Sequence, residues 1–172
     1  MKVANFLKES GWELEINNNE ISVDLLSEKI RNRISNVPYE LKELMSSVNI
    51  LENSDATAWF ITNQDLLEKN EEDSFAWNEF EKQSLEASID EKSKEPIIQF
   101  WESHFCFLMS VKTGYSHISI VTKGNEKGKI VFGFEPEYEE VNVLANDFEE
   151  FCQIMIDHIN DSKFNEYLEQ IL

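Results

Sequence analysis

The chain has 172 residues, the length of one ordinary domain, and 41% of them are hydrophobic and 28% charged, as in folded globular proteins. It carries 34 Asp and Glu against 15 Lys and Arg, a formal net charge of −19 at pH 7. Because phosphate binding needs clustered cations, this excess rules out nucleic acid as the expected direct partner and disfavours an anionic membrane surface. A basic protein partner is compatible with it.

The sequence shows neither a targeting signal nor a membrane span. Residues 1–10 place charges where a signal peptide has its apolar core, and no apolar run approaches the roughly 18 residues that a span needs. Cys106 and Cys152 each lie in an apolar run and are too few for a disulfide framework, so we expect two buried, reduced thiols. These features indicate a cytoplasmic protein.

The first third of the chain reads mainly as helices. We expect a short helix at 3–8, a strand at 12–16, a helix at 22–37 capped by Ser22, and a helix at 38–48 with Pro38 in its first turn. The apolar positions of the two longer helices are Leu26, Ile30, Ile34 and Val37, then Leu41, Leu44, Met45 and Val48.

The next part begins with a short strand and continues into a charged segment. Residues 58–62 are apolar and bounded by polar residues, which favours a strand, and Asn63 can cap a short helix behind it. Residues 71–85 read as an irregular helical stretch. Residues 86–95 are polar and end at Pro96, so we expect this stretch to be partly loop.

Three consecutive strands follow, at 105–111, 115–122 and 129–134. The first is apolar on both faces, so we expect it at the centre of a sheet that is covered on two sides. Short turns join the strands, at Gly114 and at 123–128, and this spacing predicts an antiparallel meander.

The chain ends in a short strand and two helices. We expect a strand at 141–144, then a helix at 148–159 entered through a capping box of Asn146 and Glu149, and a last helix at 164–172. The segregation of helices and strands predicts an α+β fold: N-terminal helices, a central antiparallel meander, and C-terminal helices packed on the sheet. We interpret residues 1–172 as a single domain, with its core at about 22–159 and a charged insert at about 70–96.

No familiar catalytic or ligand-binding motif is present. His104, His117 and His158 have no zinc-ligand spacing, and neither Gly-x-Ser-x-Gly nor a glycine-rich phosphate loop occurs. We therefore expect no catalytic residue, no metal and no cofactor, and a protein that is not an enzyme.

Two acidic clusters stand out, each with an aromatic residue beside or within it. Either they are solvated surface, or they form a docking face for a basic protein, in which Trp77 and Tyr138 would serve as anchors. Core packing is the alternative role for Trp77. The candidate partner-binding residues are Glu71, Glu72, Asp73 and Trp77 in the first cluster, and Glu135, Glu137, Tyr138, Glu139 and Glu140 in the second.

The order of elements resembles the SUKH superfamily. The resemblance covers about 22–159 and lies in the Asn36-Val-Pro-Tyr-Glu-Leu-Lys-Glu-Leu-Met45 segment, in 58–67, in the 105–134 meander, and in 134–151 with its Phe148 and Phe151. The chain departs from the family pattern at Asn49, which Ile50 follows where the family often has glycine, and in the charged insert.

The resemblance implies a non-enzymatic binding protein. Bacterial members of the family are commonly immunity proteins that neutralise toxins, often nucleases, and a nuclease surface is basic because it holds phosphate. The alternative is a regulatory or scaffold protein of the same fold with a cellular partner that is not a toxin.

Overall fold

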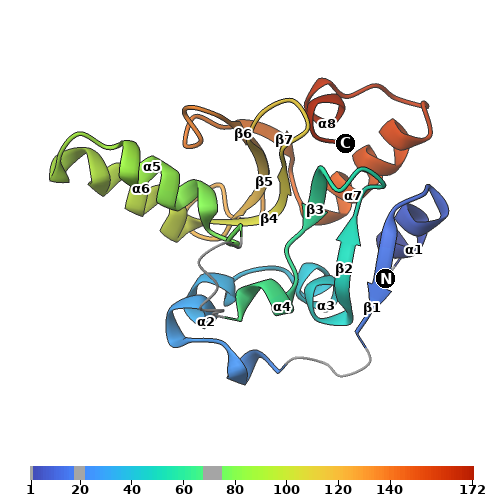
Figure 1. Ribbon diagram of the computed structural model, residues 1–172, viewed down its shortest axis with the longest axis horizontal. Helices are drawn as coiled ribbons and strands as arrows, with labels where there is room; N and C mark the ends of the chain where they lie inside the picture. The colour runs from blue at the N-terminus through green and yellow to red at the C-terminus, as the bar shows by residue number, and fades with distance from the viewer. Residues whose placement is uncertain (1, 18–21, 68–74) are drawn as a thin grey trace.

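The computed structural model describes residues 2–17, 22–67 and 75–172. The described residues form a seven-stranded antiparallel sheet in which the strand order follows the chain (Figure 1). This confirms the predicted α+β class with a meander. The strands are β1 (Glu13–Ile16), β2 (Val48–Glu52), β3 (Ala58–Phe60), β4 (His104–Ser110), β5 (Ser116–Val121), β6 (Ile130–Phe134) and β7 (Asn142–Ala145).

Helices precede, interrupt and follow the sheet. Figure 1 shows α5 and α6 on one side of strands β4 to β6 and α7 on the other. Among the described residues, no helix combines the length and the apolar character that a bilayer crossing requires. The helices are α1 (Lys2–Glu9), α2 (Glu28–Ile34), α3 (Tyr39–Ser47), α4 (Asn63–Leu66), α5 (Glu79–Ala87), α6 (Glu91–Ser103), α7 (Phe148–Ile159) and α8 (Glu166–Ile171), with a 3-10 turn η1 (Val23–Leu25).

Strand β4 lies at the middle of the sheet, as its two apolar faces predicted. All its residues except His104 are buried, and it pairs with β3 and β5. The ring of Phe107 packs edge-on against Phe148 and Phe151 of α7, with centroids 5.7 and 5.3 Å apart. The predicted stripe of α7 therefore faces the sheet.

The N-terminal helices differ from their predicted bounds. Ser22 caps only η1, and Ser27 caps α2 by accepting a hydrogen bond from the Ile30 N–H. The predicted single helix is therefore divided, because Ser27 provides a second N-cap and α2 starts there as a separate helix. Val48, predicted as the last position of a helical stripe, instead begins β2, a strand that the sequence pattern did not reveal.

The charged insert forms two helices. The expectation that residues 86–95 are partly loop is confirmed at 88–90, which separate the two helices, and α6 then starts at Glu91 and continues through Pro96 to Ser103. A capping box between Asp90 and Ser93 starts this helix. Pro96 therefore lies inside a helix, where it removes one backbone hydrogen bond while the rest of the helix forms.

Helix α7 has the predicted bounds, but its N-cap lies one residue later than predicted. Asp147 is the N-cap and accepts from the Glu150 N–H at 2.8 Å, while the Glu150 carboxylate accepts from the Asn146 N–H at 2.7 Å. The predicted capping box of Asn146 and Glu149 is therefore not formed, because Asp147 caps the helix and Glu150 bonds back to Asn146.

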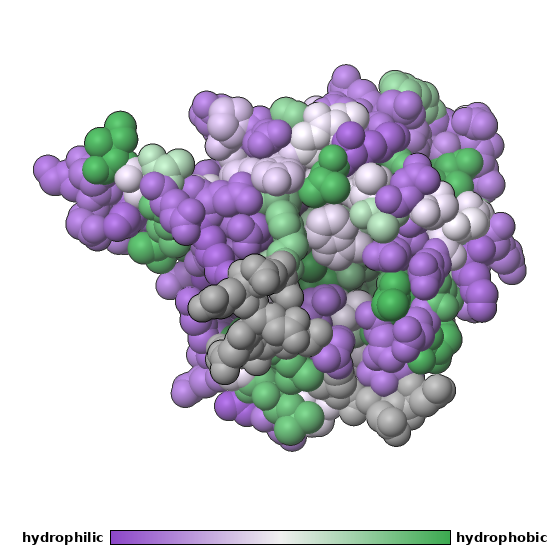
Figure 2. Space-filling model, in the orientation of Figure 1, coloured by the Kyte–Doolittle hydropathy of each residue, from purple (hydrophilic) through white to green (hydrophobic). Residues whose placement is uncertain are grey.

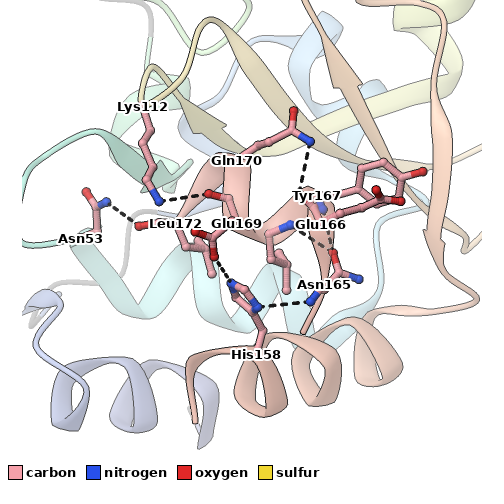
Figure 3. Close-up of polar contacts among 10 residues, drawn as sticks. Asn53, Lys112, His158, Asn165, Glu166, Tyr167, Glu169, Gln170 and Leu172 are labelled. Atoms are coloured by element: carbon pink, nitrogen blue, oxygen red, sulfur yellow. Dashed lines mark hydrogen bonds and ion pairs between the residues drawn. The ribbon is translucent and has the colours of Figure 1, made fainter. Parts of the chain in front are cut away.

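The short helix α8 is fastened to its neighbours by polar contacts (Figure 3). His158 of α7 accepts from the Asn165 N–H at 3.3 Å and lies 3.7 Å from the Glu169 carboxylate. Side chains beside the sheet satisfy the free carbonyls of the helix end: Lys112 bonds the carbonyl of Glu169, and Asn53 that of Leu172.

Candidate functional site

The two helices of the insert form a projecting arm, residues 79–103, which stands off the body of the molecule (Figure 1). Within the arm, residues 85–100 include no buried side chain. The buried side chains lie at its base: Phe80, Glu81, Ser84 and Trp101. The arm is thus packed against the body at its base, and its outer part has no buried side chain.

A buried ion pair fixes the base of the arm to α2. Arg33 donates from Nη1 and Nη2 to the two carboxylate oxygens of Glu81, the second bond at 2.7 Å, and the side chains are 9% and 7% exposed. The guanidinium also lies 5.6 Å from the ring centre of Trp77. Two parallel bonds set orientation as well as distance, so this pair fixes how the arm leaves the body.

Beneath the arm, His117 of β5 is fully buried and bonded at both ring nitrogens. Its Nε2 lies 3.0 Å from the Tyr138 carbonyl and its Nδ1 2.8 Å from the Ser119 hydroxyl. Burial lowers the pKa of His117 to about 4, although the Tyr138 carbonyl opposes the shift. The ring is therefore neutral at pH 7, with Nε2–H donating to the carbonyl and Nδ1 accepting from Ser119.

The two cysteines are both free thiols, and burial raises the pKa of each to about 12. Cys106 is buried, as expected, whereas Cys152 on α7 is partly exposed. A thiol that stays protonated at pH 7 is a poor nucleophile and a poor metal ligand. The chemistry of Cys106 is that of a small core side chain.

Tyr138 is buried at the base of the arm and is 3% exposed. Its ring stacks on Phe80 at 4.7 Å and 18°, and its hydroxyl donates to Gln83 of α5 at 2.9 Å. Burial and nearby carboxylates raise its pKa. The sequence interpretation of Tyr138 as a surface anchor amid acids is thus replaced by a core contact, because Tyr138 fills the space beside Phe80.

Of the other residues of the second acidic cluster, two form hydrogen bonds to neighbouring residues and two are exposed. Glu139 accepts from the Trp101 indole N–H at 2.7 Å, and Glu135 accepts from the Tyr115 N–H at 3.1 Å. Glu137 and Glu140 are exposed. The buried Tyr138 between them gives these two carboxylates a fixed place at the foot of the arm.

Trp77 lies at the base of the arm and is half-buried, stacked on Phe105 with ring centres 6.4 Å apart. This position agrees with the core-packing alternative. The remaining residues of the first predicted cluster, Glu71, Glu72 and Asp73, lie outside the described residues.

The space between the arm and the sheet is almost filled. A cavity of about 10 Å³ remains there, lined by Arg33, Trp77, Trp101 and Cys106 among others, and this volume is roughly that of one water. Across the ranges 2–17, 22–67 and 75–172, no group of three or more His, Cys, Asp and Glu side chains is placed to hold a metal ion.

Sequence reasoning missed Ile89, at the tip of the arm, and the pairing of Arg33 with Glu81. Ile89 had a signal, since it is the one large apolar residue between Glu86 and Pro96. The ion pair had none, because its partners lie 48 residues apart in the sequence.

The chain was compared with family models, with curated proteins and with solved structures, and none of the three gave a match. Its resemblance to the SUKH superfamily therefore stays a hypothesis that rests on the residues quoted for it.

Proposed function

We propose that this chain is a non-enzymatic module that binds a basic protein through the acidic surface at the foot of the arm. Following the SUKH resemblance, we infer a bacterial immunity protein that acts in the cytoplasm, with a toxin domain, for example a nuclease, as the partner. The alternative within the same fold is a regulatory or scaffold protein with another cellular partner. The identity of the protein encoded beside the gene separates these two.

One observation carries the proposal: Glu137 and Glu140 are exposed while the residues around them are anchored. Tyr138 is buried against Phe80, and Glu139 is bonded to Trp101, so the segment is held in one conformation. Seven acidic and no basic residues lie between 135 and 150. A fixed negative surface attracts a positive one and speeds its association.

The test is the association rate with the purified toxin domain encoded by the adjacent open reading frame, measured by stopped-flow fluorescence at low and high salt. The variant Glu137→Lys/Glu140→Lys should associate roughly tenfold more slowly, with little change in dissociation. Glu139 is left intact because it holds Trp101.

The control is Glu9→Lys/Glu13→Lys, on α1 and β1 at the opposite side of the molecule in Figure 1. Each double variant changes the net charge by four, from −19 to −15. Equal slowing by both would show that only the overall charge matters and would remove the acidic segment from the interface. Absence of binding by the unaltered protein at low salt would contradict the proposed function itself.

A further inference from the structure

The tip of the arm exposes an isoleucine almost completely. Ile89, in the turn between α5 and α6, is 98% exposed. Figure 2 shows hydrophobic atoms at the far end of the arm, set among hydrophilic ones. Single exposed apolar residues are common on protein surfaces, so exposure alone decides nothing. Ile89 differs from such residues because it lies at the end of a projecting element, where a partner can reach it.

The turn around Ile89 is held on both sides by capping bonds. Before it, the Ser88 hydroxyl donates to the Leu85 carbonyl at 2.6 Å. After it, Asp90 accepts from the Ser93 N–H at 2.9 Å, and the Ser93 hydroxyl donates to the Asp90 carbonyl at 2.7 Å. A side chain presented on a fixed backbone loses less conformational entropy on binding.

Acidic side chains outnumber basic ones on the outer part of the arm, residues 86–95. Glu86, Asp90, Glu91 and Glu95 are all exposed on the outer part of the arm, against Lys92 and Lys94. Lys94 is already paired with Glu91 at 2.7 Å. Hydrogen bonds from Ser93 hold the pKa of Asp90 below its usual value, so this carboxylate stays charged at neutral pH.

We propose that the arm is the docking element of the molecule, and that Ile89 enters an apolar pocket rimmed by Lys and Arg on a basic protein. This inference rests on the proposed function and adds the contact that gives the complex its lifetime. Charge selects the occupant: a second copy of this chain also carries −19 and would be repelled, whereas a positive rim is complementary to the acids around Ile89.

The test replaces Ile89 and follows the same purified toxin domain as above by surface plasmon resonance. Ile89→Ser should raise the dissociation rate about tenfold or more, as expected for an apolar anchor, and leave the association rate nearly unchanged. The matched control is Leu25→Ser, because Leu25 is 69% exposed on η1, away from the arm. Neither substitution should move the thermal unfolding midpoint.

The outcomes separate this inference from the proposed function. Salt-sensitive binding with the same dissociation rate for Ile89→Ser and the unaltered protein would overturn the docking arm and leave the acidic surface as the interface. No binding at all would overturn both.

A second measurement needs no purified partner. Benzoylphenylalanine at position 89, and at position 25 as control, is photo-crosslinked in the producing cells, and the adducts are identified by mass spectrometry. A basic protein captured from position 89 and not from position 25 supports the inference. Adducts with a second copy of the chain, or none that are specific to position 89, contradict it.

Discussion

Burial determines the protonation of the side chains beneath the arm. His117 is neutral at pH 7 and Cys106 keeps its proton, because desolvation disfavours the charged form of each. His117 nevertheless has a hydrogen-bond partner at both nitrogens. Gly133 makes room for it, since a Cβ at that position would lie 2.2 Å from His117 Nε2. The histidine thus specifies packing in this part of the core.

The burial of His117 predicts a pH dependence of stability. Its folded pKa is about 4, below the ordinary histidine value of 6.5, so between these values the unfolded chain binds a proton that the folded chain does not. The contribution of His117 to the free energy of unfolding should be complete above about pH 6.5 and should decrease as the pH falls towards 4. His104, whose pKa burial also lowers, acts in the same direction.

Urea denaturation of the unaltered protein and of His117→Gln, at several pH values between 7 and 4, measures this effect. The variant is less stable throughout but should show a shallower loss with falling pH. Parallel curves would mean that His117 carries no part of the pH dependence, since the carboxylates titrate in both proteins.

Single residues were the hardest part of the site to predict. The sequence offers Trp77 and Tyr138 as interface anchors because they lie beside acids, with core packing as the alternative for Trp77, whereas in the structure Tyr138 is buried and Trp77 half-buried. Local sequence indicates that an aromatic residue is near charge, but its burial depends on which distant element covers it. Here α5, with Phe80 and Gln83, covers Tyr138.

At the scale of elements, one buried ion pair joins the base of the arm to α2. Glu81→Ala should destabilise the fold by about 3–5 kcal/mol, because it leaves the Arg33 guanidinium buried without a counter-ion. The double variant Arg33→Met/Glu81→Leu should recover most of that loss, since the charge is removed together with its partner. Chemical denaturation compares the variants, and equal losses in single and double variants would show that packing outweighs the charge.

The α7 stripe makes a second prediction at this scale. Phe151 is fully buried against Phe107, so Phe151→Ala should cost about 3–5 kcal/mol of unfolding free energy. Phe164→Ala removes the same side chain where it is 71% exposed, and should cost less than about 1 kcal/mol. Similar losses at both positions would contradict the packing of α7 on the sheet.

The meander and the last long helix could be predicted because their patterns are local. Strands β4 to β6 have short turns between them, and α7 has a continuous apolar stripe. Strand β2 and helix α6 could not. Val48 continues the spacing of the preceding helix, so the pattern hides the strand start, and Pro96 resembles a helix break although α6 tolerates it near its beginning.

At the scale of the whole molecule, the charge of −19 must be accommodated in the folded state. Repulsion among surface carboxylates favours expansion, and salt screens it, since the Debye length falls from about 30 Å at 0.01 M to about 3 Å at 1 M. The thermal unfolding midpoint should therefore rise with sodium chloride concentration. Scanning fluorimetry can follow it, and the Glu9→Lys/Glu13→Lys variant should rise less. A falling midpoint would contradict this account.

The arm is inserted between two strands that pair directly with each other. β3 and β4 are neighbours in the sheet, with Phe60 opposite Leu108, although α4, α5 and α6 lie between them in the sequence. The cost of closing such a connection grows only slowly with its length. The outer turns of α5 and α6 can therefore be shortened or extended while the pairing of β3 with β4 stays intact, so this part of the molecule can vary in length on a constant sheet.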